Sequence, residues 1–291
     1  MRIIRYRDGA VAQLAAVTDE EQLYPISDAD YMTLLASAKQ QGKTPLQYVN
    51  AIIADAEPAA GDWRKLELLA PIEAPEVWAA GVTYQRSREA RNYEATGGKL
   101  DASTFYDKVY DAERPELFLK STAARTVGPN DQVSLRNDSQ WQVPEPELGL
   151  VLSSEGAIVG YIIGNDMSCR DIEGENPLYL PQAKVWKRSC AIGPAIRLPE
   201  TVADPYALDI ACRIYRDGEK LVDESASTGQ LKRKLEELAS YLHRDNVVFD
   251  GTVLLTGTCV VPPNQFTLEA GDVIEIEITG LGTLVNTAAM A

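Results

Sequence analysis

The feature that most constrains this fold is a series of short apolar or alternating segments, which runs from about residue 75 to the end of the chain. Examples are ELGLVLS, AIVGYII, LDIACRIYRDG and DVIEIEITGLGTLVN, and Gly, Pro, Asn and Asp separate such segments. Runs of this length and period are typical of β-strands, and the residues between them favour turns. One helix is predicted within GQLKRKLEELASYLHRD, where leucines recur as an apolar stripe. We therefore expect a mostly β domain.

The beginning of the chain has a different pattern. Residues 1–25 alternate around an Asp-Gly turn, which predicts a hairpin, and two helices should follow, with Ser27 and Thr44 as their N-caps. Segments rich in Pro, Gly and Ala interrupt the chain near residue 60 and again just after residue 70. The sequence thus predicts a small N-terminal α/β domain over residues 1–70 and a larger domain over residues 71–291.

Composition limits the partners and the compartment. The 28 basic and 43 acidic residues give a net charge of −15, and the averaged field of such a protein repels nucleic acid and anionic membranes. The four cysteines form no CxxC pair, the N-terminus lacks a signal-peptide core, and no apolar run reaches the roughly 18–20 residues of a membrane helix. We expect a cytoplasmic protein that binds a small anionic molecule through local cations or a metal.

The stretch VPEPELG carries two carboxylates, Glu145 and Glu147, at positions that face the same side of a strand. A hairpin returning through SSEG would place Asp166 roughly opposite residues 143–145. Oxygen ligands select a hard cation, with Mg²⁺ or Mn²⁺ favoured and Ca²⁺ also able to bind, whereas zinc usually brings His or Cys. The alternative is that both glutamates are exposed on a proline-stiffened loop and that Asp166 is a turn residue.

Several motifs in order resemble the fumarylacetoacetate hydrolase family. They are the E-x-E of Glu145 and Glu147, then GYIIGND, SCRD, Lys184, IGPAI and LLTGT, and together they cover roughly residues 75–291. The resemblance implies an α+β fold with a mixed β-roll or β-sandwich catalytic domain and a smaller N-terminal domain. It also implies Mg²⁺ or Mn²⁺ held by Glu145, Glu147 and Asp166, and a homodimer or homotetramer.

The sequence departs from the hydrolytic members of that family. Their loop carries a His that activates water, but GVTYQRSREAR has Ser87 at the expected position. The chain's only histidine, His243, falls at the end of the predicted helix, where a cation favours the helix dipole. The stretches SCRDIEGENPLYLPQAKVW and RPELFLK instead resemble the branch that dehydrates 2-keto-3-deoxy sugar acids. This implies Mg²⁺-dependent conversion of 2-keto-3-deoxy-D-arabinonate, or a related pentonate, to 2,5-dioxopentanoate.

Two residues are candidates for proton transfer in such a reaction. Lys184, whose pKa would fall if it were buried near the metal, could move the C3 proton, or it could only neutralise the substrate carboxylate. Glu116, at the start of a predicted strand, could protonate the departing C4 hydroxyl, or it could be an exposed acid.

Three further residues are candidates for substrate binding. Thr256, before a glycine at a strand end, could bind the substrate carboxylate, or it could be a turn threonine. Tyr84 and Arg88 lie in a predicted lid loop, where packing and a solvated helix face are the alternatives. Arg170 and Asp171 are expected to form an ion pair behind Asp166.

Two other functions remain open from the sequence. The chain could be an acylpyruvate hydrolase or oxaloacetate decarboxylase of the same family that uses a base other than His. It could also be a non-catalytic protein that binds a 2-oxoacid at a retained metal site.

Overall fold

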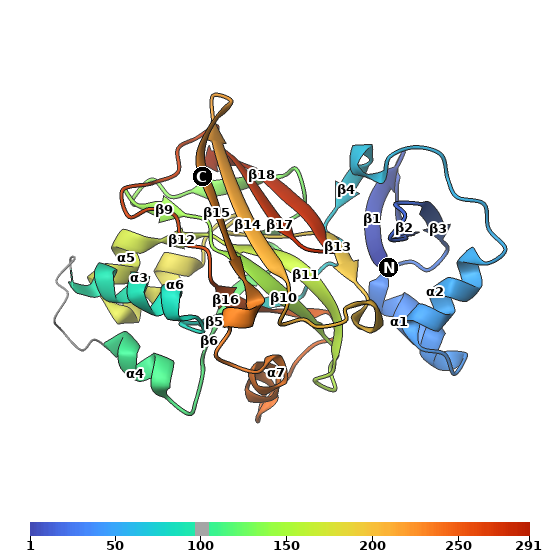
Figure 1. The fold of residues 1–291 in the computed structure, drawn as a ribbon, viewed down its shortest axis with the longest axis horizontal. Coiled ribbons are helices and arrows are strands. Elements are labelled where there is room, and N and C mark those ends of the chain that lie inside the picture. The colour runs from blue at the N-terminus through green and yellow to red at the C-terminus, as the bar shows by residue number, and fades with distance from the viewer. Residues whose placement is uncertain (97–104) are drawn as a thin grey trace.

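A computed structural model describes residues 1–96 and 105–291 of the protein, which folds into β-sheets flanked by short helices (Figure 1). The strands are β1 (Arg2–Asp8), β2 (Val11–Val17), β3 (Leu23–Ile26), β4 (Glu67–Leu69), β5 (Glu76–Gly81), β6 (Glu116–Thr122), β7 (Thr126–Val127), β8 (Gln132–Leu135), β9 (Gln142–Val143), β10 (Pro146–Leu152), β11 (Ile158–Asp166), β12 (Ser168–Cys169), β13 (Cys190–Arg197), β14 (Asp209–Arg216), β15 (Glu219–Ser227), β16 (Thr252–Thr258), β17 (Val273–Ile278) and β18 (Gly282–Met290). The helices are α1 (Tyr31–Gln40), α2 (Pro45–Ile53), α3 (Gln85–Thr96), α4 (Phe105–Asp111), α5 (Arg170–Glu175), α6 (Leu180–Lys184) and α7 (Leu235–His243).

The described strands form two large mixed sheets and a small one. The largest follows the order β3-β2-β1-β13-β11-β10-β16-β5-β6, with β4 added on β1 and β7 on β13. The second follows the order β15-β14-β17-β18-β8, and β12 pairs with β9. This strand-rich α+β architecture confirms the fold class expected from the sequence.

The main core lies between the two large sheets. Leu148 and Leu150 of β10 belong to the same buried cluster as Ile276 of β17. On the opposite face of β10, Val151 belongs to a second cluster with Leu34 of α1. Both faces of this sheet are therefore covered, which is why every residue of β10 is buried and why its sequence is apolar at nearly every position.

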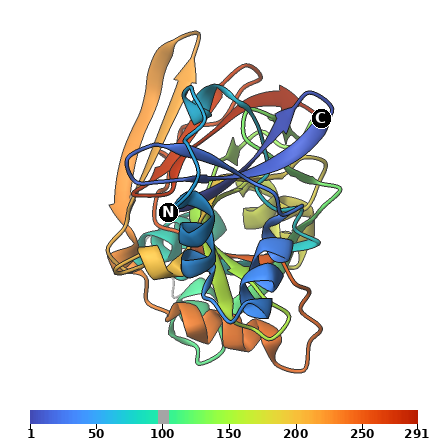
Figure 2. The same ribbon diagram turned by 90° about the vertical axis from the view of Figure 1, so that its right-hand side faces the viewer.

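The beginning of the chain extends the largest sheet. The predicted hairpin is present as β1 and β2, and β1 also pairs antiparallel with β13, deep in the larger predicted domain. Helices α1 and α2 lie beside these first strands (Figures 1 and 2). The first strands and the larger predicted domain thus share one sheet, and a separate N-terminal domain that ends at residue 70 stays a prediction.

The first helix begins later than predicted. Its N-cap is Asp30, which accepts a hydrogen bond from the Thr33 N–H at 2.7 Å, so the assignment to Ser27 is wrong. Asp and Ser are about equally good caps, and the sequence SDAD offers several of them. Thr44 does cap α2, in a reciprocal arrangement with Gln47.

The leucine-rich helix is also shorter than its pattern suggests. Helix α7 starts at Leu235, because the preceding residues make tertiary contacts. Leu231 forms an isolated bridge with Tyr84, and the Lys232 N–H donates to the Thr83 carbonyl at 3.0 Å. The segment before α7 is thereby attached to the loop that follows β5.

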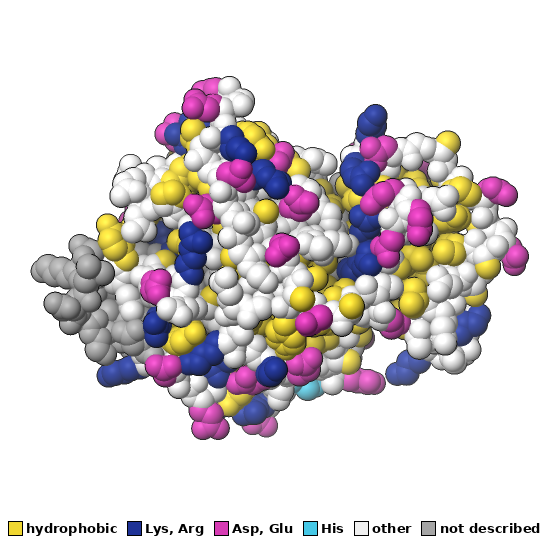
Figure 3. All heavy atoms as spheres, viewed as in Figure 1, with side chains coloured by type: hydrophobic (Ala, Val, Ile, Leu, Met, Phe, Trp, Pro, Cys, Tyr) yellow, Lys and Arg dark blue, Asp and Glu magenta, His cyan; other side chains and the backbone are white. Residues whose placement is uncertain are grey.

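Charged side chains of both signs are interspersed over the face shown in Figure 3. Within the described parts of the chain, no helix is both long enough and apolar enough to cross a membrane.

Candidate metal and substrate site

The β10–β11 hairpin brings three carboxylates together. Its register pairs Glu147 with Gly164, and the Asp166 N–H donates to the Glu145 carbonyl at 3.0 Å, as the hairpin argument predicts. Ligand oxygens of Glu145, Glu147 and Asp166 all lie within 4.8 Å of one another. The three residues are between 1% and 4% exposed, so the alternative of exposed loop acids is wrong.

A glycine in β16 supports Glu147. The Gly257 N–H donates to Glu147 Oε2 at 2.6 Å. Gly257 has a φ of +97°, and a Cβ at this position would lie 1.9 Å from Thr83 Oγ1, so only glycine fits. Burial, together with the nearby carboxylates of Asp166 and Glu145, raises the pKa of Glu147 well above its usual value.

Two cations hold Glu145. Arg170 Nη2 donates to one of its oxygens at 2.8 Å, and Lys184 Nζ donates to the other at 2.6 Å. Although burial opposes it, the charges of Lys184 and Arg170 keep the pKa of Glu145 below its usual value. The predicted ion pair between Arg170 and Asp171 is wrong. Arg170 donates to Glu145, whereas Asp171 accepts hydrogen bonds from Ser139 and the Gln140 N–H.

Lys184 lies at the centre of the site, completely buried. Besides Glu145, its Nζ reaches Ser168 Oγ at 2.5 Å and Asp166 Oδ2 at 3.3 Å. Burial favours the neutral amine, but Asp166, Glu145 and Glu173 outweigh it and raise the pKa of Lys184. Without a cation the amine therefore stays charged, and the lowering expected beside a bound metal stays a prediction.

The carboxylate cluster fits a hard divalent cation. Among the described residues, neither carboxylate oxygen of Asp166 accepts a hydrogen bond, although Lys120 Nζ lies 2.7 Å from Oδ1. Buried carboxylates this close repel one another unless a cation lies between them. The converging donors are all oxygens, which suits Mg²⁺, Mn²⁺ or Ca²⁺ better than zinc.

Glu116 lies beside this cluster, as the first residue of β6. It pairs with Gly81 of β5, and a Cβ on Gly81 would lie 2.1 Å from Glu116 Oε2. That oxygen is buried and accepts no hydrogen bond from the described residues. Burial raises the pKa of Glu116, Arg91 opposes the rise, and Glu173 adds to it. Glu116 is thus suited to carry a proton.

The three predicted substrate-binding residues do not line the space beside the carboxylates. Thr256 donates its hydroxyl to the Leu148 carbonyl at 2.8 Å, so that group is engaged inside the sheet. Tyr84 is 1% exposed and belongs to the main core, and Arg88 lies over the Tyr110 ring. The lining includes Val82, Ser87, Arg91, Phe118, Gly257 and Thr258 instead.

Sequence reasoning missed three charged residues of the site. Lys120 is fully buried and donates to the carbonyls of Met167, at 2.7 Å, and of Lys184. Arg91 of α3 pairs with Glu173 of α5, whose Oε1 lies 3.8 Å from Lys184 Nζ. Strand parity could have found Lys120, because residues 116, 118 and 120 share one face of β6. No local pattern marked Glu173.

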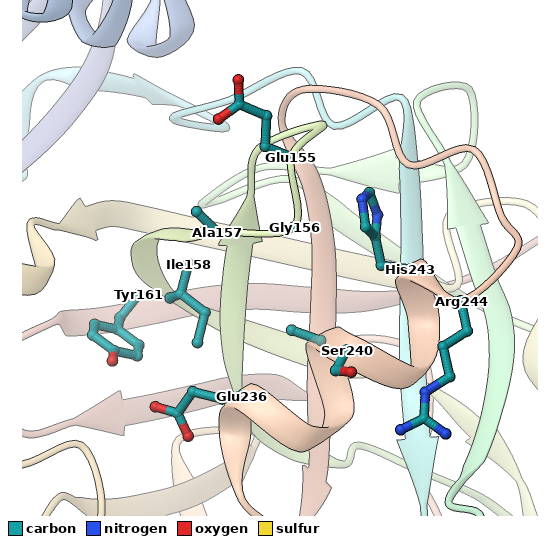
Figure 4. Close-up of a pocket in the computed structure, with 10 residues that line it drawn as sticks. Glu155, Gly156, Ala157, Ile158, Tyr161, Glu236, Ser240, His243 and Arg244 are labelled. Carbon is teal, nitrogen blue, oxygen red and sulfur yellow. The ribbon is translucent and has the colours of Figure 1, made fainter.

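His243 lies in a different place. It lines a groove of about 690 Å³ between α7 and the β10–β11 turn, together with Glu155 and Tyr161 (Figure 4). That turn is at the opposite end of the hairpin from Glu147, roughly 17 Å away at the rise of a strand. This position fits the prediction that His243 is not the catalytic base.

Comparisons with known proteins identify the family. Residues 85–289 match the family model "Fumarylacetoacetate (FAA) hydrolase C-terminal". The chain is 52% identical over 217 residues to the "Probable 2-keto-3-deoxyxylonate dehydratase" of Haloferax volcanii, covering 75% of this chain and 73% of that protein. It is 46% identical over 221 residues to the "2-dehydro-3-deoxy-D-arabinonate dehydratase" of Saccharolobus solfataricus, covering 76% and 74%.

A solved structure is similar over the whole chain. It is described as "2-keto-3-deoxy-D-arabinonate dehydratase complexed with magnesium and 2,5-dioxopentanoate". The TM-score is 0.85 at 35% sequence identity, and the match covers 100% of this chain and 99% of that one.

Proposed function

This chain belongs to the fumarylacetoacetate hydrolase family, and from that premise we propose that it dehydrates a 2-keto-3-deoxy-pentonate to 2,5-dioxopentanoate with Mg²⁺ as cofactor. One observation carries the proposal. The buried carboxylates of Glu145, Glu147 and Asp166 lie beside a buried lysine and a half-buried acid of raised pKa, in a chain about half identical over three quarters of its length to two dehydratases of such acids.

Glu145, Glu147 and Asp166 would hold the Mg²⁺, and Mn²⁺ or Ca²⁺ could use the same ligands. When bound, the cation supplies Lewis acidity that polarises the 2-keto group and makes the C3 proton acidic. The chain's own residues then have to bind the substrate, move the two protons of the elimination and let protons shift in the isomerisation that follows.

Lys184 is our candidate for the proton at C3. In the structure the surrounding carboxylates keep its amine charged. Glu145 and Asp166 stabilise that charge less once they also share a divalent cation, which favours the neutral amine that can accept a proton. The alternative is that Lys184 stays charged and binds the substrate carboxylate. The kcat and KM of a Lys184→Met variant distinguish the two roles.

Glu116 is our candidate acid. It would give its proton to the departing C4 hydroxyl, which leaves as water while the electrons of the C3–H bond form the C3–C4 double bond. The elimination product is the C3–C4 enone, which still carries its hydroxyl on C5. Loss of a C5 proton and addition of a proton at C3 convert it to the C4–C5 enol, and that enol takes a proton at C4 and loses its O–H proton to become the aldehyde of 2,5-dioxopentanoate. The raised pKa of Glu116 supports this role, because the acid must be protonated near neutral pH.

Replacing Glu116 by Gln should lower kcat by roughly 10²–10⁴-fold, since Gln keeps the shape but has no proton to give. In the unaltered protein, kcat should fall as pH rises through the raised pKa of Glu116, and that fall should be absent in the variant. The measurement is kcat from pH 5 to 10. An unchanged profile in Glu116→Gln would contradict the role.

Hydrolysis of an acylpyruvate, or decarboxylation of oxaloacetate, is the second candidate. Ser87 is buried at the position where the hydrolases carry their His. Its hydroxyl donates to the Tyr84 carbonyl at 2.8 Å and accepts from the Tyr84 N–H at 3.2 Å. Both hydrogen bonds tie the Ser87 hydroxyl to the backbone of the loop, and a serine hydroxyl is no strong base that could activate water. This favours dehydration over hydrolysis.

The test is incubation of chelator-stripped protein with 2-keto-3-deoxy-pentonates, with and without Mg²⁺, in an assay coupled to aldehyde oxidation. Metal-dependent formation of 2,5-dioxopentanoate is expected. Pyruvate release from an acylpyruvate or from oxaloacetate, with no aldehyde formed, would favour the second candidate. Tight 2-oxoacid binding without any turnover would indicate a binding protein.

We propose further that the protein is a cytoplasmic homodimer or homotetramer. Its four cysteines are free, which suits a reducing compartment. Strand β15 is an edge of the second sheet, and its Leu221 is exposed. Proteins often cover an exposed apolar edge strand, and a second copy of the chain could cover this one. Sedimentation velocity at micromolar concentration would contradict the assembly if only a monomer were seen.

A further inference from the structure

Val82 has a backbone conformation that its side chain disfavours. Its φ is +52°, in the left-handed region. Among the described non-glycine residues with positive φ, Val82 is the β-branched one; the others are Glu21, Asn130, Arg188, Asp217 and Asp245. A β-branched residue is a genuine outlier there, because its Cβ substituents crowd the backbone.

Glycine would adopt this conformation without strain. Two glycines, Gly81 and Gly257, line the same space as Val82. Gly81 immediately precedes Val82, and Gly257 lies across from it at the end of β16; a side chain at either position would overlap Glu116 or Thr83. At residue 82 the chain instead retains a valine against its backbone preference. Such strain persists where the side chain has a function.

Val82 lies at the candidate site. It is 6% exposed and lines the same space as Glu147, Asp166 and Lys184. The volume of that space is only about 10 Å³, close to what a single water needs. A sugar acid needs far more room than one water, so the lining has to move to admit it, and the bulk of each lining side chain adds to what must move.

The lining contains both charged and apolar residues. Carboxylates, Lys184 and Arg91 are the groups that can recognise the cation and the keto-acid end of a substrate. Ala80, Val82 and Phe118 are the apolar members of the lining, and they remain for the far end of the carbon chain. Of these, Val82 is the one held in a strained conformation.

We propose that the Val82 side chain limits the length of the sugar acid, so that a 2-keto-3-deoxy-pentonate is turned over in preference to the six-carbon 2-keto-3-deoxy-hexonate. The inference rests on the proposed function and adds a specificity-determining residue to it. Val82 takes no part in proton transfer.

The experiment compares kcat/KM for the five- and six-carbon acids in the unaltered protein and in Val82→Ala, Val82→Gly and Val82→Ile. The ratio of six-carbon to five-carbon kcat/KM should rise by about 10–200-fold in the Ala and Gly variants, the range for one or a few methyl-sized groups. In Val82→Ile, kcat/KM for the five-carbon acid should fall.

Thermal melting tests the strain separately. Ala keeps the Cβ and Gly removes it, so Val82→Gly should melt above Val82→Ala, the reverse of the usual order. Asp217, with a φ of +51° in the turn between β14 and β15, is the control: its Ala and Gly variants should leave the substrate ratio unchanged.

If the ratio of six-carbon to five-carbon kcat/KM is unchanged in Val82→Ala and Val82→Gly, while five-carbon turnover is normal, the inference is overturned and the proposed function still stands. Val82→Ala melting above Val82→Gly would overturn the strain argument. No turnover of the five-carbon acid by the unaltered protein would remove the proposed function, and this inference with it.

Discussion

Replacing Asp166 by Asn is expected to reduce Mg²⁺-dependent turnover on the order of 10³-fold or more, because it removes a charged ligand at the centre of the carboxylate cluster. The transition-state stabilisation that a bound cation gives an oxyanion is several kcal/mol, and each 1.4 kcal/mol is a factor of ten in rate. Asp166 also pairs with Lys120 at 2.7 Å and with Lys184 at 3.3 Å, so the substitution removes the charge opposite two buried amines as well.

The measurements are steady-state kinetics and calorimetric titration with Mn²⁺, which reports metal affinity independently of turnover. Glu155→Gln is the matched control, since that side chain is 80% exposed at the far end of the same hairpin. Normal Mn²⁺ affinity in Asp166→Asn would show that Asp166 is not a ligand. Circular dichroism should show both variants folded.

Replacing Lys184 by Met should lower kcat by roughly 10²–10⁴-fold with little change in KM, if the lysine transfers the proton at C3. The methionine keeps most of the volume of the buried side chain and removes the amine that contacts Glu145, Ser168 and Asp166. If Lys184 only binds the substrate carboxylate, the change should appear mainly in KM.

Stability has to be separated from catalysis in this variant. Loss of Lys184 removes one cation from beside Glu145 and Asp166, but Arg170 still pairs with Glu145 and Lys120 with Asp166. The cost should therefore be smaller than the roughly 3–5 kcal/mol of an uncompensated buried charge. Assays should therefore be run at a temperature where circular dichroism shows the variant folded. Lys187→Met, at an exposed lysine three residues later, should change neither kcat nor stability.

Local pattern was enough to predict the strands and the position of the carboxylates. Alternation, turn residues and the length of the segment between Glu147 and Asp166 are properties of contiguous chain, and a hairpin's register follows from them. The resemblance to the family came from motifs of the same local kind. The position of Glu116 at the start of β6 was also predicted, because that strand is recognisable in the sequence, and its role stays a proposal.

Local sequence pattern could not predict which side chains contact those carboxylates. Thr256 was expected to face the substrate, but its hydroxyl bonds to Leu148 of the neighbouring strand. Lys120 reaches Asp166 from the edge strand β6, although four strands separate β6 from β11 along the chain. Which side chains meet there depends on strand order and on the parity of strands distant in sequence.

The sequence by itself determined the class of fold, the hairpin that carries the three carboxylates and the family to which the chain belongs. Only the tertiary structure decided that Lys184 is surrounded by carboxylates, that Arg91 pairs with Glu173, and that a valine with positive φ borders the space beside them. The reason is physical: short-range geometry follows from neighbouring residues, whereas burial, the pKa of a buried group and the shape of a cavity depend on every element that packs around them.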